Sequence, residues 1–148
     1  MTTGRTYAVT FAAVAIAAAQ DLFEIQPADD KPVEIIGWNI GQTSDAGDAQ
    51  DEQLQITVVR GHSTSGSGGT SATPRPLNPN DAAAGFTAEV NNTTQIAVGT
   101  GTLTTIAMDP FNVRTGLLYV PLPEVRWMQA NQNYIAIGMA AAPADSIT

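Results

Sequence analysis

The chain has 148 residues, of which 43% are hydrophobic, 14% charged and 6% aromatic, and its formal net charge is −8. This composition is typical of one globular domain and excludes a disordered tail. The excess of acidic over basic side chains, 14 against 6, disfavours nucleic acid and anionic membranes as partners, because both repel an acidic surface. With no cysteine and a single histidine, His62, the chain lacks the side chains for disulfides, thiolate metal sites and multi-histidine metal sites.

The N-terminal third begins with apolar and small residues in alternation. Tyr7, Val9 and Phe11 alternate with Ala8 and Thr10, which predicts a half-buried strand rather than the core of a signal peptide. The apolar run that follows is too short to span a membrane. Residues 22–25 and 33–40 then flank a turn rich in proline and aspartate, which predicts a hairpin.

The rest of the chain shows repeated strand patterns and weak helical signals. Further strands are predicted at residues 54–59, 86–90, 94–98, 102–108, 116–120 and 134–139. The alanine-rich segments 12–19 and 82–84 are too short to form stable helices without packing. Many short strands with glycine and proline turns predict an all-β fold in one domain, residues 1–148: an antiparallel β-sandwich of jelly-roll type.

Two segments interrupt the strand pattern. Residues 62–80 are rich in Ser, Gly and Pro, which predicts a long flexible loop, or an arm that becomes ordered on a neighbouring molecule. Residues 45–52 carry four carboxylates, Asp45, Asp48, Asp51 and Glu52. The default interpretation of this acidic loop is a solvated surface; the alternative is a calcium site, because Ca²⁺ takes several oxygen ligands from flexible loops.

No motif in the sequence indicates catalysis or a cofactor. The glycine-rich stretch 66–69 lacks the lysine and the helix of a phosphate-binding loop, and the chain has no nucleophile elbow. Trp38 and Trp127 are expected in the core or an interface rather than on a sugar-binding surface, because large aromatic residues dominate burial in small β-domains. The sequence therefore predicts a structural or binding protein with no catalytic residues and no cofactor.

Several short strings together resemble a known group of proteins. They are 18–25 (AAQDLFEI), 41–45 (GQTSD), 60–61 (RG), 80–85 (NDAAAG), 91–94 (NNTT) and 111–113 (FNV). Through them the chain, over roughly residues 7 to 145, resembles small proteins of tailed bacteriophages and prophages, some of which look like capsid decoration (cement) proteins. These strings are turn and strand signatures that carry no diagnostic chemistry.

The resemblance implies a jelly-roll-like subunit of the virion. Such a subunit sits on the outer surface of the capsid, commonly as a homotrimer, and clamps adjacent major capsid subunits; it is in the host cytoplasm during assembly. Residues expected to make these contacts are Tyr7, Phe11, Pro74, Pro76, Trp127, Met128 and Tyr134. The alternative is a carbohydrate- or receptor-binding module of a phage tail or head fibre, with Trp38 or Trp127 stacking on a sugar. An exposed aromatic platform would favour that alternative, and a broad apolar flank would favour binding to the capsid lattice.

Overall fold

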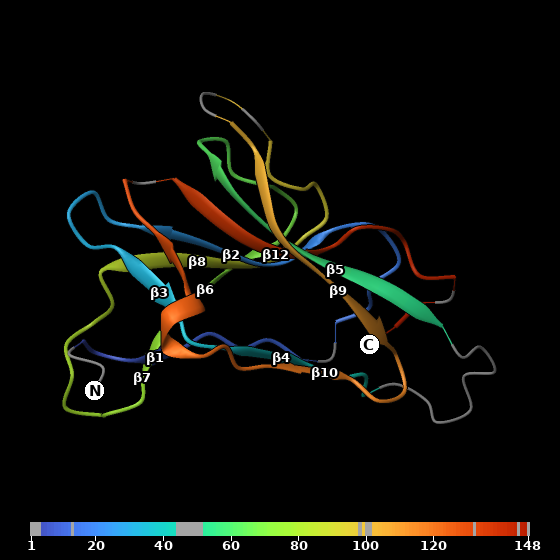
Figure 1. Ribbon diagram of the computed structural model, residues 1–148, viewed down its shortest axis with the longest axis horizontal. Coiled ribbons are helices and arrows are strands. Elements are labelled where there is room, and N and C mark those ends of the chain that lie inside the picture. The colour runs from blue at the N-terminus through green and yellow to red at the C-terminus, as the bar shows by residue number, and fades with distance from the viewer. Residues whose placement is uncertain are drawn as a thin grey trace.

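A six-stranded antiparallel sheet forms one layer of the molecule, in the order β6-β8-β2-β12-β5-β9 (Figure 1). Its strands are β6 (Thr70–Ala72), β8 (Phe86–Asn92), β2 (Asp21–Pro27), β12 (Tyr134–Met139), β5 (Gln53–His62) and β9 (Thr104–Asn112). The computed structural model describes residues 4–12, 14–43, 52–97, 99, 102–131, 133–144 and 146–147. Strand β12 lies near the centre of the sheet, and five of its six residues are buried.

Three antiparallel strand pairs complete the described sheets. They are β4 (Trp38–Ile40) with β10 (Leu117–Tyr119), β3 (Val33–Ile35) with β11 (Trp127–Gln129), and β1 (Tyr7–Ala8) with β7 (Arg75–Pro76). A single turn of 3₁₀ helix, η1 (Pro123–Val125), lies between β10 and β11. Figure 1 shows β4 and β10 running along the side of the molecule opposite the long strands β5 and β9.

The hydrophobic core lies between the six-stranded sheet and the pairs β4–β10 and β3–β11. Its members come from both layers and include Leu22, Ile35, Trp38, Leu54, Ile56, Phe111, Ile135, Ile137 and Met139. Tyr119 stacks on Trp38 with ring centroids 5.6 Å apart and on Trp127 with centroids 4.7 Å apart. The antiparallel sheets and the core packed between the two layers confirm the predicted all-β, antiparallel β-sandwich. The division into one six-stranded sheet and three pairs differs from the two Greek-key sheets of a jelly roll, so the jelly-roll assignment is not confirmed.

Most predicted strands are present, but the predicted hairpin is wrong. The turn forms, with a bridge between Ala28 and Lys31, yet β2 pairs with β8 and β12 while β3 and β4 pair with strands of the other layer. Four of the seven residues of β2 are buried, so this strand needs a neighbour at each edge. The chain therefore leaves the large sheet at the turn instead of folding back on β2.

The segment 62–80 also differs from the expected flexible loop. It contains β6 and β7, and two isolated bridges join Thr64 to Ala97 and Ser67 to Thr94. The predicted strand at 94–98 is reduced to these bridges, and the predicted N-terminal strand is reduced to β1. No α-helix occurs in the described part of the chain, and none of its helical turns is long and apolar enough to cross a membrane.

Candidate functional site

Five exposed apolar side chains follow one another in the chain along β10, η1 and β11, in the layer opposite the six-stranded sheet. Leu118, Val120, Leu122, Val125 and Met128 are 73%, 67%, 71%, 59% and 54% exposed, respectively. We call these five residues the apolar strip. They lie within eleven consecutive residues, and the only charged side chains in that span are those of Glu124 and Arg126.

Strand alternation explains why two members of the apolar strip, Leu118 and Met128, point into solvent. Leu117 and Tyr119 pack against the core, so Leu118 between them points away from it. In the same way Trp127 packs against the core and Met128, the next residue, faces outward. The guanidinium of Arg126 is engaged by Glu34, with 3.2 Å between Nη1 and Oε1. The strip is therefore apolar apart from the exposed Glu124, the Glu34–Arg126 pair and the Arg60 guanidinium, whose Nη1 donates to the carbonyl of Met128 at 2.9 Å.

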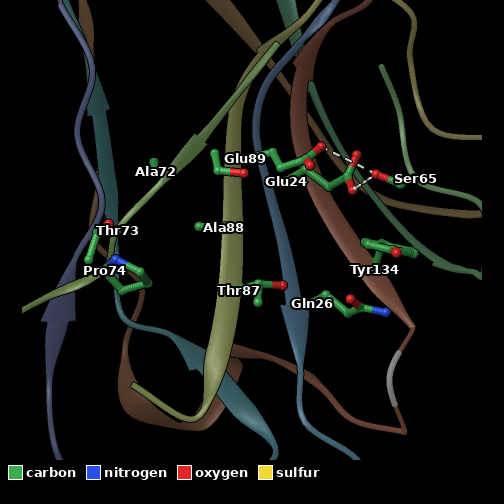
Figure 2. A pocket seen from close by; sticks show the side chains of 11 residues that line it. Glu24, Gln26, Ser65, Ala72, Thr73, Pro74, Thr87, Ala88, Glu89 and Tyr134 are labelled. Atoms are coloured by element: carbon green, nitrogen blue, oxygen red, sulfur yellow. Dashed lines mark hydrogen bonds between the residues drawn. The ribbon is translucent and has the colours of Figure 1, made fainter. Parts of the chain in front are cut away.

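The opposite outer face, on the six-stranded sheet, carries a polar hollow of about 380 Å³ (Figure 2). Phe23 and Ile25 of β2 pack against the core, so Glu24 and Gln26 point out of this other face. Glu24 is directly opposite Glu89 of β8 in the strand register. Like charges directly opposite one another destabilise a sheet unless other groups compensate.

Three donors surround the Glu24 carboxylate, which is only 2% exposed. The hydroxyl of Ser65 donates to Oε1 at 2.6 Å, while the backbone N–H of Gly66 and the amide of Asn92 donate to Oε2 at 2.8 and 2.9 Å. Ser65 and Asn92 also donate to Oε2 of Glu89, at 3.3 and 3.2 Å. Figure 2 shows Ser65 beside both carboxylates. These shared donors offset the repulsion between the two acids.

The segments 64–67 and 94–97 pair with each other and cover the buried acids. Besides Ser65 and Gly66 above Glu24, the backbone N–H of Ile96 donates to Oδ2 of Asp21 at 2.7 Å. Burial raises the pKa of Asp21 from 3.8 to about 6, the hydrogen bonds from Ile96 and Gln95 oppose that rise, and the charge of Glu24 adds to it. Burial, and then the charge of Glu24, also raises the pKa of Tyr134 at the edge of the hollow.

The acidic loop, for which a calcium site was the alternative interpretation, lies almost entirely outside the described residues. Asp45, Asp48 and Asp51 belong to that part of the chain. The carboxylate of Glu52 accepts the backbone N–H of Ala144 at 2.7 and 2.9 Å. Within the described ranges, no three acidic, histidine or cysteine side chains come together in a way that could hold a metal ion.

The residues expected to make contacts fall in three different places. Trp127 and Met128 lie at the apolar strip, Trp127 half-buried beneath it and Met128 within it. Pro74 and Tyr134 line the hollow. These two groups are on opposite faces of the sandwich.

The remaining three lie near the N-terminal strand. Tyr7 and Pro76 are paired across β1 and β7, and the hydroxyl of Tyr7 donates to the carbonyl of Ala82 at 2.9 Å. The ring of Phe11 packs edge-on against Phe23, with centroids 5.2 Å apart. All three side chains are half-buried within the fold itself.

Sequence reasoning missed four of the five residues of the apolar strip and the pairing of Glu24 with Glu89 in the hollow. The signal for Leu118 and Val120 was present, because alternation in 116–120 puts every second residue on one face. Leu122 and Val125 lie in an irregular segment with no period to read. The pairing of Glu24 with Glu89 joins residues 65 positions apart, and only the strand register reveals it.

Comparison with known proteins finds no matching family model, no matching curated protein and no matching solved structure.

Proposed function

We propose that the chain is a structural protein of a tailed bacteriophage: a decoration subunit that binds the outside of the capsid lattice and stabilises contacts between major capsid subunits. The observation that carries the proposal is the apolar strip. Monomeric proteins rarely expose contiguous large apolar patches, and patches rimmed by polar residues mark contacts with other proteins. The resemblance to phage decoration proteins supplies the identity of the partner and the homotrimeric state.

The chemistry of the strip suits a protein contact. Each of its side chains, once covered by a neighbour, contributes on the order of 1–2 kcal/mol of binding free energy. A subunit that binds the assembled lattice better than free capsid proteins shifts the equilibrium towards the shell. Many copies on one shell add their contributions. The net charge of −8 favours solubility of the unbound trimers, because like-charged particles repel and do not associate further.

Binding of a sugar through the tryptophans is less well supported. Trp38 is 8% exposed, and both Trp38 and Trp127 stack on the ring of Tyr119. None of the large exposed apolar side chains in the described ranges is aromatic. A flat stacking platform is therefore lacking at these two residues, whereas five exposed apolar side chains follow β10, η1 and β11.

The test is co-sedimentation with capsids of the parent phage that lack this protein. We expect saturable binding at a stoichiometry set by the lattice, and a trimer in sedimentation velocity. Leu118→Asp with Leu122→Asp should abolish binding without unfolding the protein. The matched control is Leu77→Asp, because Leu77 is 66% exposed but lies outside the strip. A monomer that does not pellet with capsids, or strip variants that bind as well as the unmodified protein, would contradict the proposal.

A further inference from the structure

The polar hollow lies on the face of the sandwich opposite the apolar strip. A subunit that docks on a shell through the strip therefore leaves the hollow directed away from the shell. The hollow has a volume of about 380 Å³, within the range of small-molecule sites. Its wall is formed by the chain that leads from β6 towards β7, and its floor by β2 and β8 (Figure 2).

The lining of the hollow determines which ligand chemistry fits. Its described lining contains two carboxylates and no basic side chain, so an anionic ligand is excluded by charge. The other polar groups are neutral hydroxyls and one amide, which belong to Gln26, Ser65, Ser71, Thr73, Thr87 and Tyr134. Carboxylates and hydroxyls offer many acceptors, so the matching ligand is rich in hydroxyl donors.

The two acids have different roles in this lining. Ser65, Gly66 and Asn92 already donate to Glu24, which is therefore held rigidly and has little acceptor capacity left. Glu89 receives its hydrogen bonds on Oε2, and its Oε1 accepts none from the described residues. Glu89 is half-exposed at the hollow. It is thus a preorganised acceptor with one oxygen open to a ligand.

Apolar surface lies beside these acceptors. Ala72, Pro74 and Ala88 line the hollow, and the ring of Tyr134 is at its opposite edge (Figure 2). A sugar ring presents hydroxyl donors around its rim and C–H groups on its faces, so it complements both parts of this lining. We propose that the hollow binds a short neutral saccharide, with Glu89 accepting from its hydroxyls and the Tyr134 ring contacting its C–H face.

The test screens the full-length protein on an array of neutral and sialylated saccharides, followed by titration calorimetry with the best-binding neutral saccharide. We expect saturable binding to a neutral saccharide and at least tenfold weaker binding by Glu89→Gln. Glu34→Gln is the matched control, because Glu34 is an exposed glutamate on a strand of the other layer. Its affinity should equal that of the unmodified protein. Thr87→Val provides a second hollow variant if Glu89→Gln fails to fold.

Two spectroscopic measurements locate the ligand independently. In ¹H–¹⁵N spectra, the amide of Gly66 should shift on saccharide addition, because its N–H donates to Glu24 beneath the hollow, while that of Leu118 should not. Tryptophan emission should stay unchanged, since both tryptophans pack with the core. The proposal is overturned if no neutral saccharide binds, or if Glu89→Gln binds the saccharide as tightly as the unmodified protein. Quenching of tryptophan emission by the saccharide would also overturn it. So would displacement of the saccharide by tetralysine, if tetralysine binds more tightly than the saccharide. The last outcome would assign the hollow to a basic peptide.

Discussion

The two outer faces of the sandwich follow the same alternation of strand residues and present opposite chemistry. On β10, the outward residue between two core residues is Leu118, which is 73% exposed. On β2, the outward residue between two core residues is Glu24, which is 2% exposed because the segment 64–67 covers it. The apolar side chain is therefore exposed to solvent and the charged side chain is buried, which is the reverse of the usual distribution.

This reversal separates the roles of the two faces. A buried carboxylate with three donors is a rigid structural unit, since loss of any donor leaves a desolvated charge less well compensated. An exposed leucine contributes little to the stability of the chain that carries it. We therefore expect substitutions of Glu24 and its donors to alter folding, and substitutions in the apolar strip to alter association while leaving folding intact.

The largest expected effect on stability is at the cover of the hollow face, the segments 64–67 and 94–97 that lie over Glu24 and Asp21. A Cβ atom at Gly66 would lie 2.6 Å from the carbonyl oxygen of Thr94 and 2.9 Å from the amide nitrogen of Asn92. Gly66→Ala should lower the free energy of unfolding by about 3 kcal/mol, because the cover must move away from Glu24. Gly41→Ala is the control, since nothing lies within 4 Å of its Cβ position. Equal urea midpoints for the two variants would show that the cover is not tightly packed.

The second effect depends on pH and concerns Asp21. Its pKa is raised to about 6 in the folded state, above the 3.8 of an unperturbed group. The folded protein therefore holds this proton more tightly than the unfolded chain, and the contribution of Asp21 to stability falls as pH rises from about 4 to about 6. Replacing Asp21 by Asn removes this loss of stability with rising pH, because an amide does not titrate.

Denaturation of Asp21→Asn and the unmodified protein at several pH values measures this difference. The stability of the variant relative to the unmodified protein should increase by up to about 3 kcal/mol between pH 4 and pH 7, and should change little above pH 7. If the difference in unfolding free energy between the variant and the unmodified protein does not depend on pH, Asp21 is ionised in the folded protein throughout this range.

Two neighbouring leucines on β10 provide a direct comparison between core and strip. Leu117 packs against the core, so Leu117→Ala should cost about 2 kcal/mol of unfolding free energy. Leu118→Ala should change it by no more than about 0.5 kcal/mol, because the side chain already lies in water. Thermal unfolding of both variants measures this difference. Similar losses of unfolding free energy in the two variants would mean that Leu118 is packed within the fold.

The smallest effect is at the ion pair beside the strip. Glu34 is partly exposed, so its bond to Arg126 is screened by solvent. Glu34→Gln should cost about 0.5 kcal/mol at low ionic strength and less in 1 M salt. A salt-independent loss of several kcal/mol would show instead that this pair anchors β3 to β11.

Much of the fold follows from the sequence, for identifiable reasons. Strands β5, β8 and β12 carry clear alternation or continuous β-branched runs, and each was predicted within a few residues. Pairing was harder to predict. The turn at 28–31 has hairpin chemistry, but the partners of β2 are chosen by burial on both of its faces, which local turn signals do not encode.

The candidate sites were less predictable than the fold. The segment 63–69 has the composition of a flexible linker, yet Ser65 and Gly66 are held by Glu24, 41 and 42 positions away. Composition describes a segment without its partners, so it cannot reveal a long-range bond of this kind. Met128 of the strip was predicted as a contact residue, whereas Leu122 and Val125 lie in an irregular segment whose exposure depends on the packing of η1.

We propose that the apolar strip, and not the hollow face, contacts a phage capsid. Hydrogen–deuterium exchange of the chain, free and bound to capsids of the phage proposed as its source, tests this proposal most directly. We predict that binding slows exchange in residues 117–128 and leaves exchange in residues 64–74 and 86–90 unchanged. Slower exchange over the hollow with none at the strip would contradict the claim, as would unchanged exchange throughout a chain that pellets with capsids.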